Sequence, residues 1–210
     1  MAATILVTGF GPFPGAPFNP TGPLVERLAR LRRPALANTK IVLHIFPTSY
    51  AAVDRDLPKL IARHRPDALL MFGLAPRARA LRIETRARNA VSLLPDVTST
   101  SPRGHTIAAG GPAAIALPAP TRYLLAAVRS SHVPVALSRD AGRYLCNYLC
   151  WRAAEAAGKP GSPRVAAFIH VPKVRRGSVP RARVKQARLS MADLARAGGA
   201  LLRATASARR

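Results

Sequence analysis

Short apolar segments alternate along the chain with longer segments in which apolar residues recur at helical spacing. In residues 23–32, for example, Leu24, Leu28 and Leu31 recur at i, i+4 and i+7 and would share one helix face. The short segments predict strands at 4–8, 40–46, 68–73, 133–137 and 164–170. The longer segments predict helices at 23–32, 50–63, 121–130, 141–156 and 189–205.

This alternation is typical of α/β proteins, in which helices cover both faces of a mostly parallel sheet. We therefore expect a three-layer α/β/α fold with an open, twisted sheet. The length of 210 residues fits a single domain over residues 1–210. Within it, a stretch at 94–120 rich in Ser, Thr, Gly and Pro predicts a long excursion beside the sheet, and residues 173–210 predict a basic C-terminal helix region.

The hydrophobic pattern also bears on location. Hydrophobic residues make up 49% of the chain, but no stretch approaches the ~18 consecutive apolar residues that cross a bilayer, so we expect no membrane span. The first residues lack the basic region of a secretory signal. Two cysteines, Cys146 and Cys150, are too few for a disulfide framework, and we expect both to stay reduced in the cytoplasm.

The charge is strongly one-sided, with 33 Lys and Arg against 9 Asp and Glu and a formal net charge of +24. Such an imbalance attracts polyanions through counterion release. However, the basic residues are dispersed except for a dense cluster at 173–188, and aromatic residues, at 5%, are too few for a nucleotide-stacking surface. We therefore expect nonspecific polyanion adsorption and no specific nucleic-acid partner.

In open α/β sheets, ligands bind beyond the carboxyl ends of the strands. The first such loop, residues 9–22, has neither Gly-Lys-Ser/Thr nor the G-x-G-x-x-G spacing, which excludes both phosphate-binding motifs. Its phenylalanines either fill the edge of the core or line an apolar pocket, and composition leaves both open. Asn19 or Thr21 is placed to cap the helix that Pro23 would begin.

Cys146 follows a predicted strand and lies within the first two turns of the predicted helix 141–156, which Ser138 or Asp140 could cap. The partial positive charge of a helix N-terminus stabilises a thiolate, as a nucleophile requires. The alternative is a small apolar residue packed in the core, and Cys150, one turn later, is assigned that role. No second cysteine pair or histidine pair accompanies this C-x-x-x-C spacing, so a zinc site is not expected.

His170 ends an apolar strand, at the sheet edge where the Cys146 helix would begin if the sheet is parallel. A histidine facing a nucleophile is a candidate base. Glu84, flanked by arginines, is either half of a surface Arg–Glu pair or the acid that orients such a histidine. The remaining histidines are interpreted as core-edge or surface residues: His44, His64, His105 and His132.

Taken together, these segments resemble the pyroglutamyl peptidase I family of cysteine peptidases. The resemblance extends over residues 5–172, in the family's order and spacing. It rests on four motifs: Gly9-Phe10-x-Pro12-Phe13 followed by Asn19-Pro20, Glu84 with Asn89, Ser138-x-x-Ala141-Gly142-x-Tyr144-x-Cys146-Asn147, and Phe168-Ile169-His170-Val171-Pro172.

The resemblance implies acyl transfer through a thioester, with Cys146 as nucleophile, His170 as general base and acid, and Glu84 as the orienting acid. Phe10 and Phe13 would sandwich the pyrrolidone ring of an N-terminal pyroglutamate. Asn19 and Leu74 would also lie at the substrate site. No metal or organic cofactor is implied, the partner is a peptide or small amide substrate, and family members are often homo-oligomers.

Two departures from the family pattern concern specificity. Where the family usually carries a glutamine that bonds the ring amide and then an arginine, this chain has Leu74 and Ala78. The aspartate-rich stretch after the conserved asparagine is also replaced, by residues 90–94. Losing a buried polar partner weakens discrimination. The alternatives are therefore a cysteine hydrolase of another small N-acyl or lactam amide, or a basic binding protein whose catalytic motifs are relics.

Overall fold

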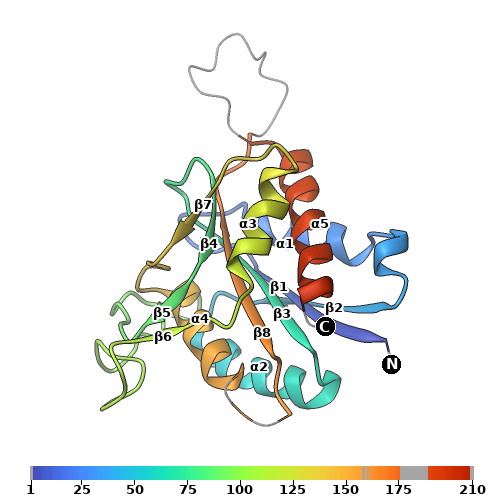
Figure 1. Ribbon diagram of the computed structural model, residues 1–210. Coiled ribbons are helices and arrows are strands. Elements are labelled where there is room, and N and C mark those ends of the chain that lie inside the picture. Colours follow the sequence, from blue (N-terminus) through green and yellow to red (C-terminus); the bar gives the residue numbers. More distant parts are fainter. Residues whose placement is uncertain (1, 158, 160, 176–188, 209–210) are drawn as a thin grey trace.

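A six-stranded, mostly parallel sheet forms the centre of the computed structural model, which describes residues 2–157, 159, 161–175 and 189–208. The strand order is β2-β1-β3-β8-β4-β7, and within it only the β4–β8 pair is antiparallel (Figure 1). The strands are β1 (Ala3–Phe10), β2 (Thr39–Phe46), β3 (Ala68–Leu74), β4 (Leu81–Glu84), β7 (Val135–Ser138) and β8 (Val165–Val171).

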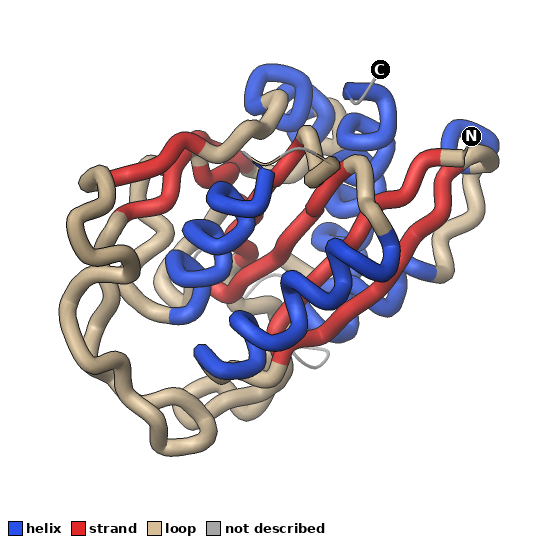
Figure 2. Tube along the Cα trace, turned by 90° about the horizontal axis from the view of Figure 1, so that it is seen from below, coloured by secondary structure: helices blue, strands red, loops and turns tan. Residues whose placement is uncertain are grey.

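Helices cover both faces of this sheet, as Figure 2 shows, so the predicted three-layer α/β/α fold is confirmed. One face packs against α1 (Thr21–Ala29), α3 (Thr121–Arg129) and α5 (Met191–Ala208), and the other against α2 (Tyr50–His64) and α4 (Leu145–Ala157). Successive strand residues point to opposite faces. Accordingly, Leu70 and Phe72 lie in the first core, and Leu69 and Met71 in the second.

Three strands and one 3-10 turn were not predicted: β4, β5 (Arg86–Arg88), β6 (Ala114–Ala116) and Pro34–Leu36. The strands have only three or four residues each, too few to show a period. They are held by pairing with distant segments, β4 between β8 and β7, and β5 against β6 in an antiparallel pair. The excursion predicted at 94–120 overlaps the polypeptide between β5 and β6 and also includes β6 itself.

Besides α5, which begins at Met191 rather than at 189, two helices begin elsewhere than predicted. The first begins at Thr21, with Pro20 at the N-cap position. Asn19 Oδ1 accepts from Thr21 N, the first N–H of this helix, at 3.1 Å, so Asn19 takes part of the capping role expected of it, whereas Thr21 does not. Instead, Thr21 Oγ1 bonds the Phe10 backbone at 3.0 Å, which closes the first loop. The other, α4, begins at Leu145 rather than at 141, because Gly142 takes a left-handed φ of 83° in a turn bonded to Asp140.

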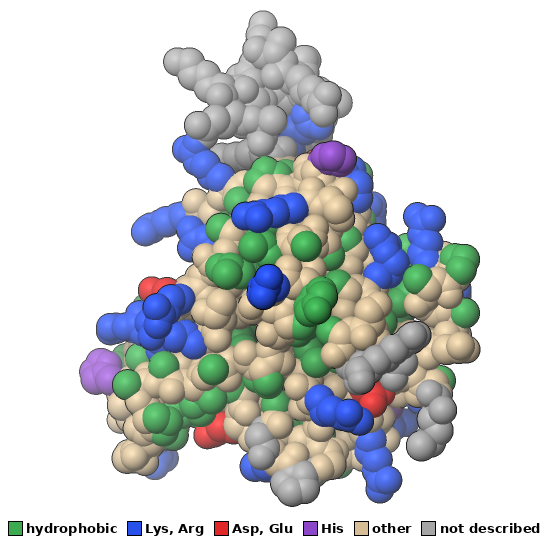
Figure 3. Space-filling view, viewed as in Figure 1, with side chains coloured by type: hydrophobic (Ala, Val, Ile, Leu, Met, Phe, Trp, Pro, Cys, Tyr) green, Lys and Arg blue, Asp and Glu red, His purple; other side chains and the backbone are tan. Residues whose placement is uncertain are grey.

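Basic side chains are spread over the face of the molecule in Figure 3 rather than gathered in one patch. Most of the 173–188 cluster lies outside the described residues. Among the described helices, none combines the length and the apolar character needed to cross a membrane.

Candidate active site

Glu84 and His170 form a buried pair across the antiparallel strands β4 and β8. His170 Nδ1 lies 2.8 Å from Glu84 Oε1, and the two side chains are 8% and 0% exposed. The geometry follows from the register, in which Arg82 is opposite His170 and Glu84 is opposite Phe168, so that all four share a face of the sheet. A surface Arg–Glu pair, the alternative for Glu84, is therefore wrong.

Cys146 lies on the same face, in the first turn of α4. A Cβ atom built on Gly73 would lie 2.7 Å from Cys146 Sγ and 2.6 Å from Phe168 Cζ, so the sulfur rests directly against the β3 backbone. Gly73 is the register partner of His170. Because Gly73 has no side chain, the thiol can approach β3 at the position next to His170 on β8. Cys146, His170 and Glu84, which were predicted from the sequence, therefore lie together.

The charge state of His170 depends on its two neighbours. Burial by itself lowers the pKa of this imidazole, but its charge and hydrogen-bond interactions with Cys146 and Glu84 outweigh burial and raise the pKa to about 9. His170 is therefore protonated at neutral pH beside the sulfur. Cys150 differs, because its complete burial raises the pKa of its thiol well above the usual value.

The start of α4 presents backbone donors to the same region. The N–H groups of Leu145, Cys146 and Asn147 precede the first intrahelical bond, which Tyr148 N donates to Tyr144 O at 3.0 Å. The Asn147 side chain fixes this turn: its Oδ1 accepts from Arg88 N at 2.9 Å, and its Nδ2 donates to two carbonyl oxygens, each at 2.8 Å. The first turn of α4, which carries Cys146, is thus held in place.

A cavity of about 440 Å³ opens in front of this group. Its walls include Cys146 and His170 together with all four residues predicted to bind substrate, which are Phe10, Phe13, Asn19 and Leu74. Phe10 is buried and Phe13 is half-buried, while Phe18 packs against the opposite core. The loop phenylalanines therefore divide between the two roles that composition left open. Ala78 is buried in the turn after β3.

The chain matches the model of one protein family, pyroglutamyl peptidase, over residues 3–197. The chain belongs to the pyroglutamyl peptidase family. It is 32% identical over 169 residues to a pyrrolidone-carboxylate peptidase of Thermococcus kodakarensis, covering 80% of each chain, and 32% identical over 170 residues to one of Ralstonia nicotianae, covering 80% and 78%.

Solved structures of pyroglutamyl peptidases share the fold. The crystal structure of pyroglutamyl peptidase I from Bacillus amyloliquefaciens superposes with a TM-score of 0.82 at 26% identity, covering 98% of this chain and 97% of that one. A pyrrolidone carboxyl peptidase from Thermococcus litoralis superposes with a TM-score of 0.85 at 24% identity. These findings confirm the family that the motifs indicated and identify the chain as a cysteine omega-peptidase.

Within this pyroglutamyl peptidase, most of the hydrogen-bonding capacity of Asn19 is used inside the first loop. Its Nδ2 donates to Gly11 O at 3.1 Å, and its Oδ1 accepts from Thr21 N and Thr21 Oγ1 at 3.1 and 2.9 Å. One amide hydrogen is left for a ligand. The substrate-binding role of Asn19 stays a prediction beside this clear structural one.

Several cavity residues were not singled out from the sequence. Tyr144 packs edge-on against Tyr50 at 5.8 Å between ring centroids and donates its hydroxyl to Pro95 O at 2.9 Å. Arg82 and Arg143 also line the cavity. Tyr144 was available as part of the cysteine motif, but nothing local marks Arg82, because its place depends on the unpredicted strand β4. In the described part of the chain, no three His, Cys, Asp or Glu side chains are grouped as metal ligands.

Proposed function

We propose that this protein hydrolyses the amide bond after an N-terminal pyroglutamyl residue, with Cys146 as nucleophile, His170 as general base and acid, and Glu84 as the residue that orients His170. The observation that carries the proposal is the 2.8 Å contact between His170 Nδ1 and Glu84 Oε1, beside a sulfur packed against Gly73. Nucleophile, base and orienting acid in this order form the triad of a cysteine peptidase.

The proposed reaction has two acyl-transfer steps. The Cys146 thiolate attacks the carbonyl carbon, and the negative oxygen that forms accepts hydrogen bonds from the free N–H groups at the start of α4. The C–N bond then breaks as protonated His170 gives its proton to the departing amine, which leaves a thioester. Water, deprotonated by His170, attacks the thioester, and pyroglutamate leaves as the thiolate re-forms.

The walls of the cavity suit an uncharged ring. Phe10 and Phe13 offer flat apolar surfaces, and Leu74 adds a further apolar side chain where the family usually has a glutamine. This substitution favours one alternative, a related cysteine hydrolase that accepts another small N-acyl or lactam amide. Because a nucleophilic Cys146 must stay reduced, we expect the protein to act in the cytoplasm.

Turnover of a pyroglutamyl aminomethylcoumarin amide under reducing conditions tests the proposal. We expect hydrolysis by the wild type, loss of activity by a factor of at least ~10³ in Cys146→Ala, and retention in the matched control Cys150→Ala. Failure of the wild type to turn over the amide, or full activity in Cys146→Ala, would contradict the proposal. Faster hydrolysis of an acetyl amide, or of an amide that carries a different lactam ring, than of the pyroglutamyl amide would instead support the alternative substrate.

A further inference from the structure

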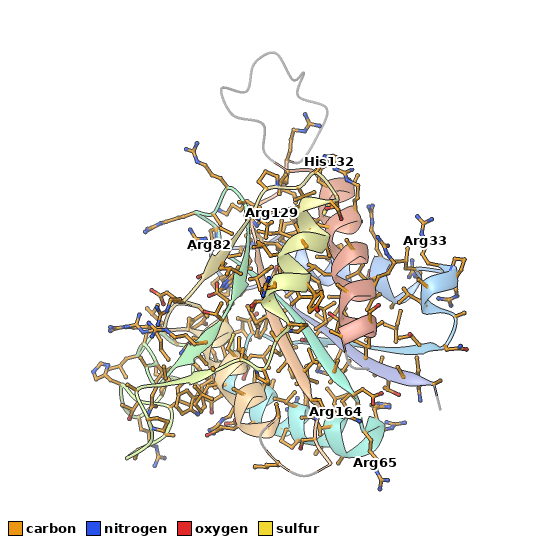
Figure 4. The ribbon with its side chains drawn as sticks, in the orientation of Figure 1. Arg33, Arg65, Arg82, Arg129, His132 and Arg164 are labelled. Carbon is orange, nitrogen blue, oxygen red and sulfur yellow. The ribbon has the colours of Figure 1, made fainter. Side chains whose placement is uncertain are left out.

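Two arginines line the cavity beside the proposed nucleophile. Arg82 is opposite His170 in the antiparallel β4–β8 pair, and residues in that relation project from the same face with Cβ atoms about 5 Å apart. Figure 4 labels Arg82 on β4. Arg143 reaches the cavity from the loop before α4, three residues ahead of Cys146. Both side chains are exposed, so a substrate in the cavity can contact them.

The positive charge of these arginines is not compensated locally. In the described part of the chain, neither Arg82 nor Arg143 forms an ion pair. Asp140 is the one acidic residue among the described cavity walls, and its Oδ1 already lies 3.2 Å from Arg88 Nη1. Glu84 lies buried behind His170, to which it is bonded. A bound substrate therefore meets two free guanidinium groups, which are strong binders of carboxylates.

The pyroglutamyl ring carries no negative charge, so a matching carboxylate must belong to the part of the substrate that leaves. We propose that Arg82, assisted by Arg143, makes this enzyme prefer pyroglutamyl substrates whose residue after the scissile bond carries a carboxylate. This inference rests on the proposed function. The carboxylate can be the side chain of an Asp or Glu residue, or the free α-carboxylate of a dipeptide.

Four substrates separate these sources: pyroglutamyl-alanine amide, pyroglutamyl-glutamate amide, pyroglutamyl-lysine amide and pyroglutamyl-alanine with a free carboxylate. Chromatographic measurement of released pyroglutamate gives kcat/KM for each. We expect kcat/KM for at least one carboxylate-bearing substrate to exceed that for the alanine amide by about tenfold, because each exposed arginine can contribute up to about fivefold. The lysine amide should have the lowest kcat/KM of the four. The better carboxylate substrate identifies the source.

The variant Arg82→Gln tests the assignment, with Arg164→Gln as the matched control. Arg164 precedes β8, at the opposite end from His170 (Figure 4), and its replacement removes the same charge. We expect Arg82→Gln to lower the ratio of kcat/KM for the carboxylate substrate to that for the alanine amide by about fivefold, and Arg164→Gln to leave it unchanged. Raising the salt to about 0.5 M should also lower the wild-type ratio.

Three outcomes would overturn the inference. Equal kcat/KM for charged and neutral pyroglutamyl substrates would refute it while leaving the proposed function in place. A ratio unchanged in Arg82→Gln would do the same, because it would mean that Arg82 serves the ring or the fold. If none of the four substrates is hydrolysed, the proposed function itself fails, and the inference fails with it.

Discussion

Glu84 has two carboxylate oxygens in different situations. Oε1 contacts His170, while Oε2 is buried without a hydrogen-bond partner among the described residues. A buried carboxylate oxygen without a partner costs free energy of folding, so this position is costly for stability. What Glu84 contributes in return is the charge state of His170, whose protonated form it stabilises.

This relation predicts a pH profile. Because the pKa of His170 is raised to about 9, we expect kcat/KM to fall as pH rises through about 9, where the imidazolium that protonates the leaving amine is lost. In Glu84→Gln the midpoint should move to lower pH, and kcat should fall about hundredfold. Rates measured from pH 5 to 11 on the pyroglutamyl amide check this. An unchanged alkaline midpoint in Glu84→Gln would show that Glu84 does not govern His170.

The stability of the fold also depends on the protonation of His170. A folded-state pKa above the unfolded value of about 6.5 means that protonated His170 stabilises the fold most below that pH. This contribution is lost as pH rises from about 6.5 through about 9.

At the scale of elements, one acidic residue joins the excursion to the site. Asp96 Oδ2 accepts from Tyr50 N, the first residue of α2, at 3.0 Å, and its Oδ1 accepts from Thr98 N at 2.8 Å. The neighbouring Pro95 carbonyl accepts the Tyr144 hydroxyl, two residues before Cys146. Pro95 and Asp96 therefore bond both the N-terminus of α2 and Tyr144, in the loop that precedes Cys146.

Replacing Asp96 by Ala should consequently weaken both elements. We expect a loss of about 1–2 kcal/mol in the free energy of unfolding, because the N-terminus of α2 loses its cap, together with a lower kcat/KM. Urea denaturation and the amide assay measure the two effects. The control is Glu26→Ala, an exposed acidic residue on α1, which should change neither. If Asp96→Ala unfolds with the same free energy as the wild type, the hydrogen bond from Tyr50 N to Asp96 does not contribute to stability.

Asp96 also has a pH signature. Burial alone would raise the pKa of its carboxyl group, but hydrogen bonds from Thr98, Ser49 and the Tyr50 backbone outweigh burial and lower the pKa to about 2. The stability that this shift contributes is present above the unfolded value of about 3.8 and is lost as pH falls through about 2.

Longer apolar strands were predicted from the sequence, and strands that depend on pairing with distant segments were not. The five predicted strands correspond to β1, β2, β3, β7 and β8, because each is a local run of apolar residues. By contrast, β4 exists because it pairs with two strands distant in sequence, and that pairing buries Glu84. The position of Glu84 was accordingly implied by family resemblance and not by its own surroundings, which suggested a surface pair.

The same limit applies to the site. Cys146 near a helix start and His170 at a strand end follow from local patterns, without the family resemblance. The need for a residue without a side chain at position 73 was not predictable from the sequence. It arises because Cys146, which lies 73 positions later in the chain, packs against Gly73. Arg82 was missed for the same reason, because its place in the cavity depends on which strand lies opposite.

At the scale of the whole molecule, the +24 charge comes mainly from arginines. Figure 3 shows Lys and Arg side chains dispersed over one face. Dispersed charge binds polyanions through counterion release without reading their sequence. We therefore expect weak oligonucleotide binding at low salt, with the dissociation constant rising about hundredfold between about 0.05 and 0.2 M salt. Fluorescence anisotropy with two unrelated oligonucleotides measures this. A sequence preference that persists at about 0.15 M salt would instead favour a specific nucleic-acid partner.

The missing side chain at Gly73 has a consequence for inhibitor chemistry. The β3 main chain at Gly73 covers one side of the Cys146 sulfur, and the cavity offers an electrophile an approach to it. A covalent reagent that reaches the sulfur through the cavity therefore contacts walls that include Phe10 and Phe13. Compact, flat warheads should label this thiol, and bulky general thiol reagents should spare it.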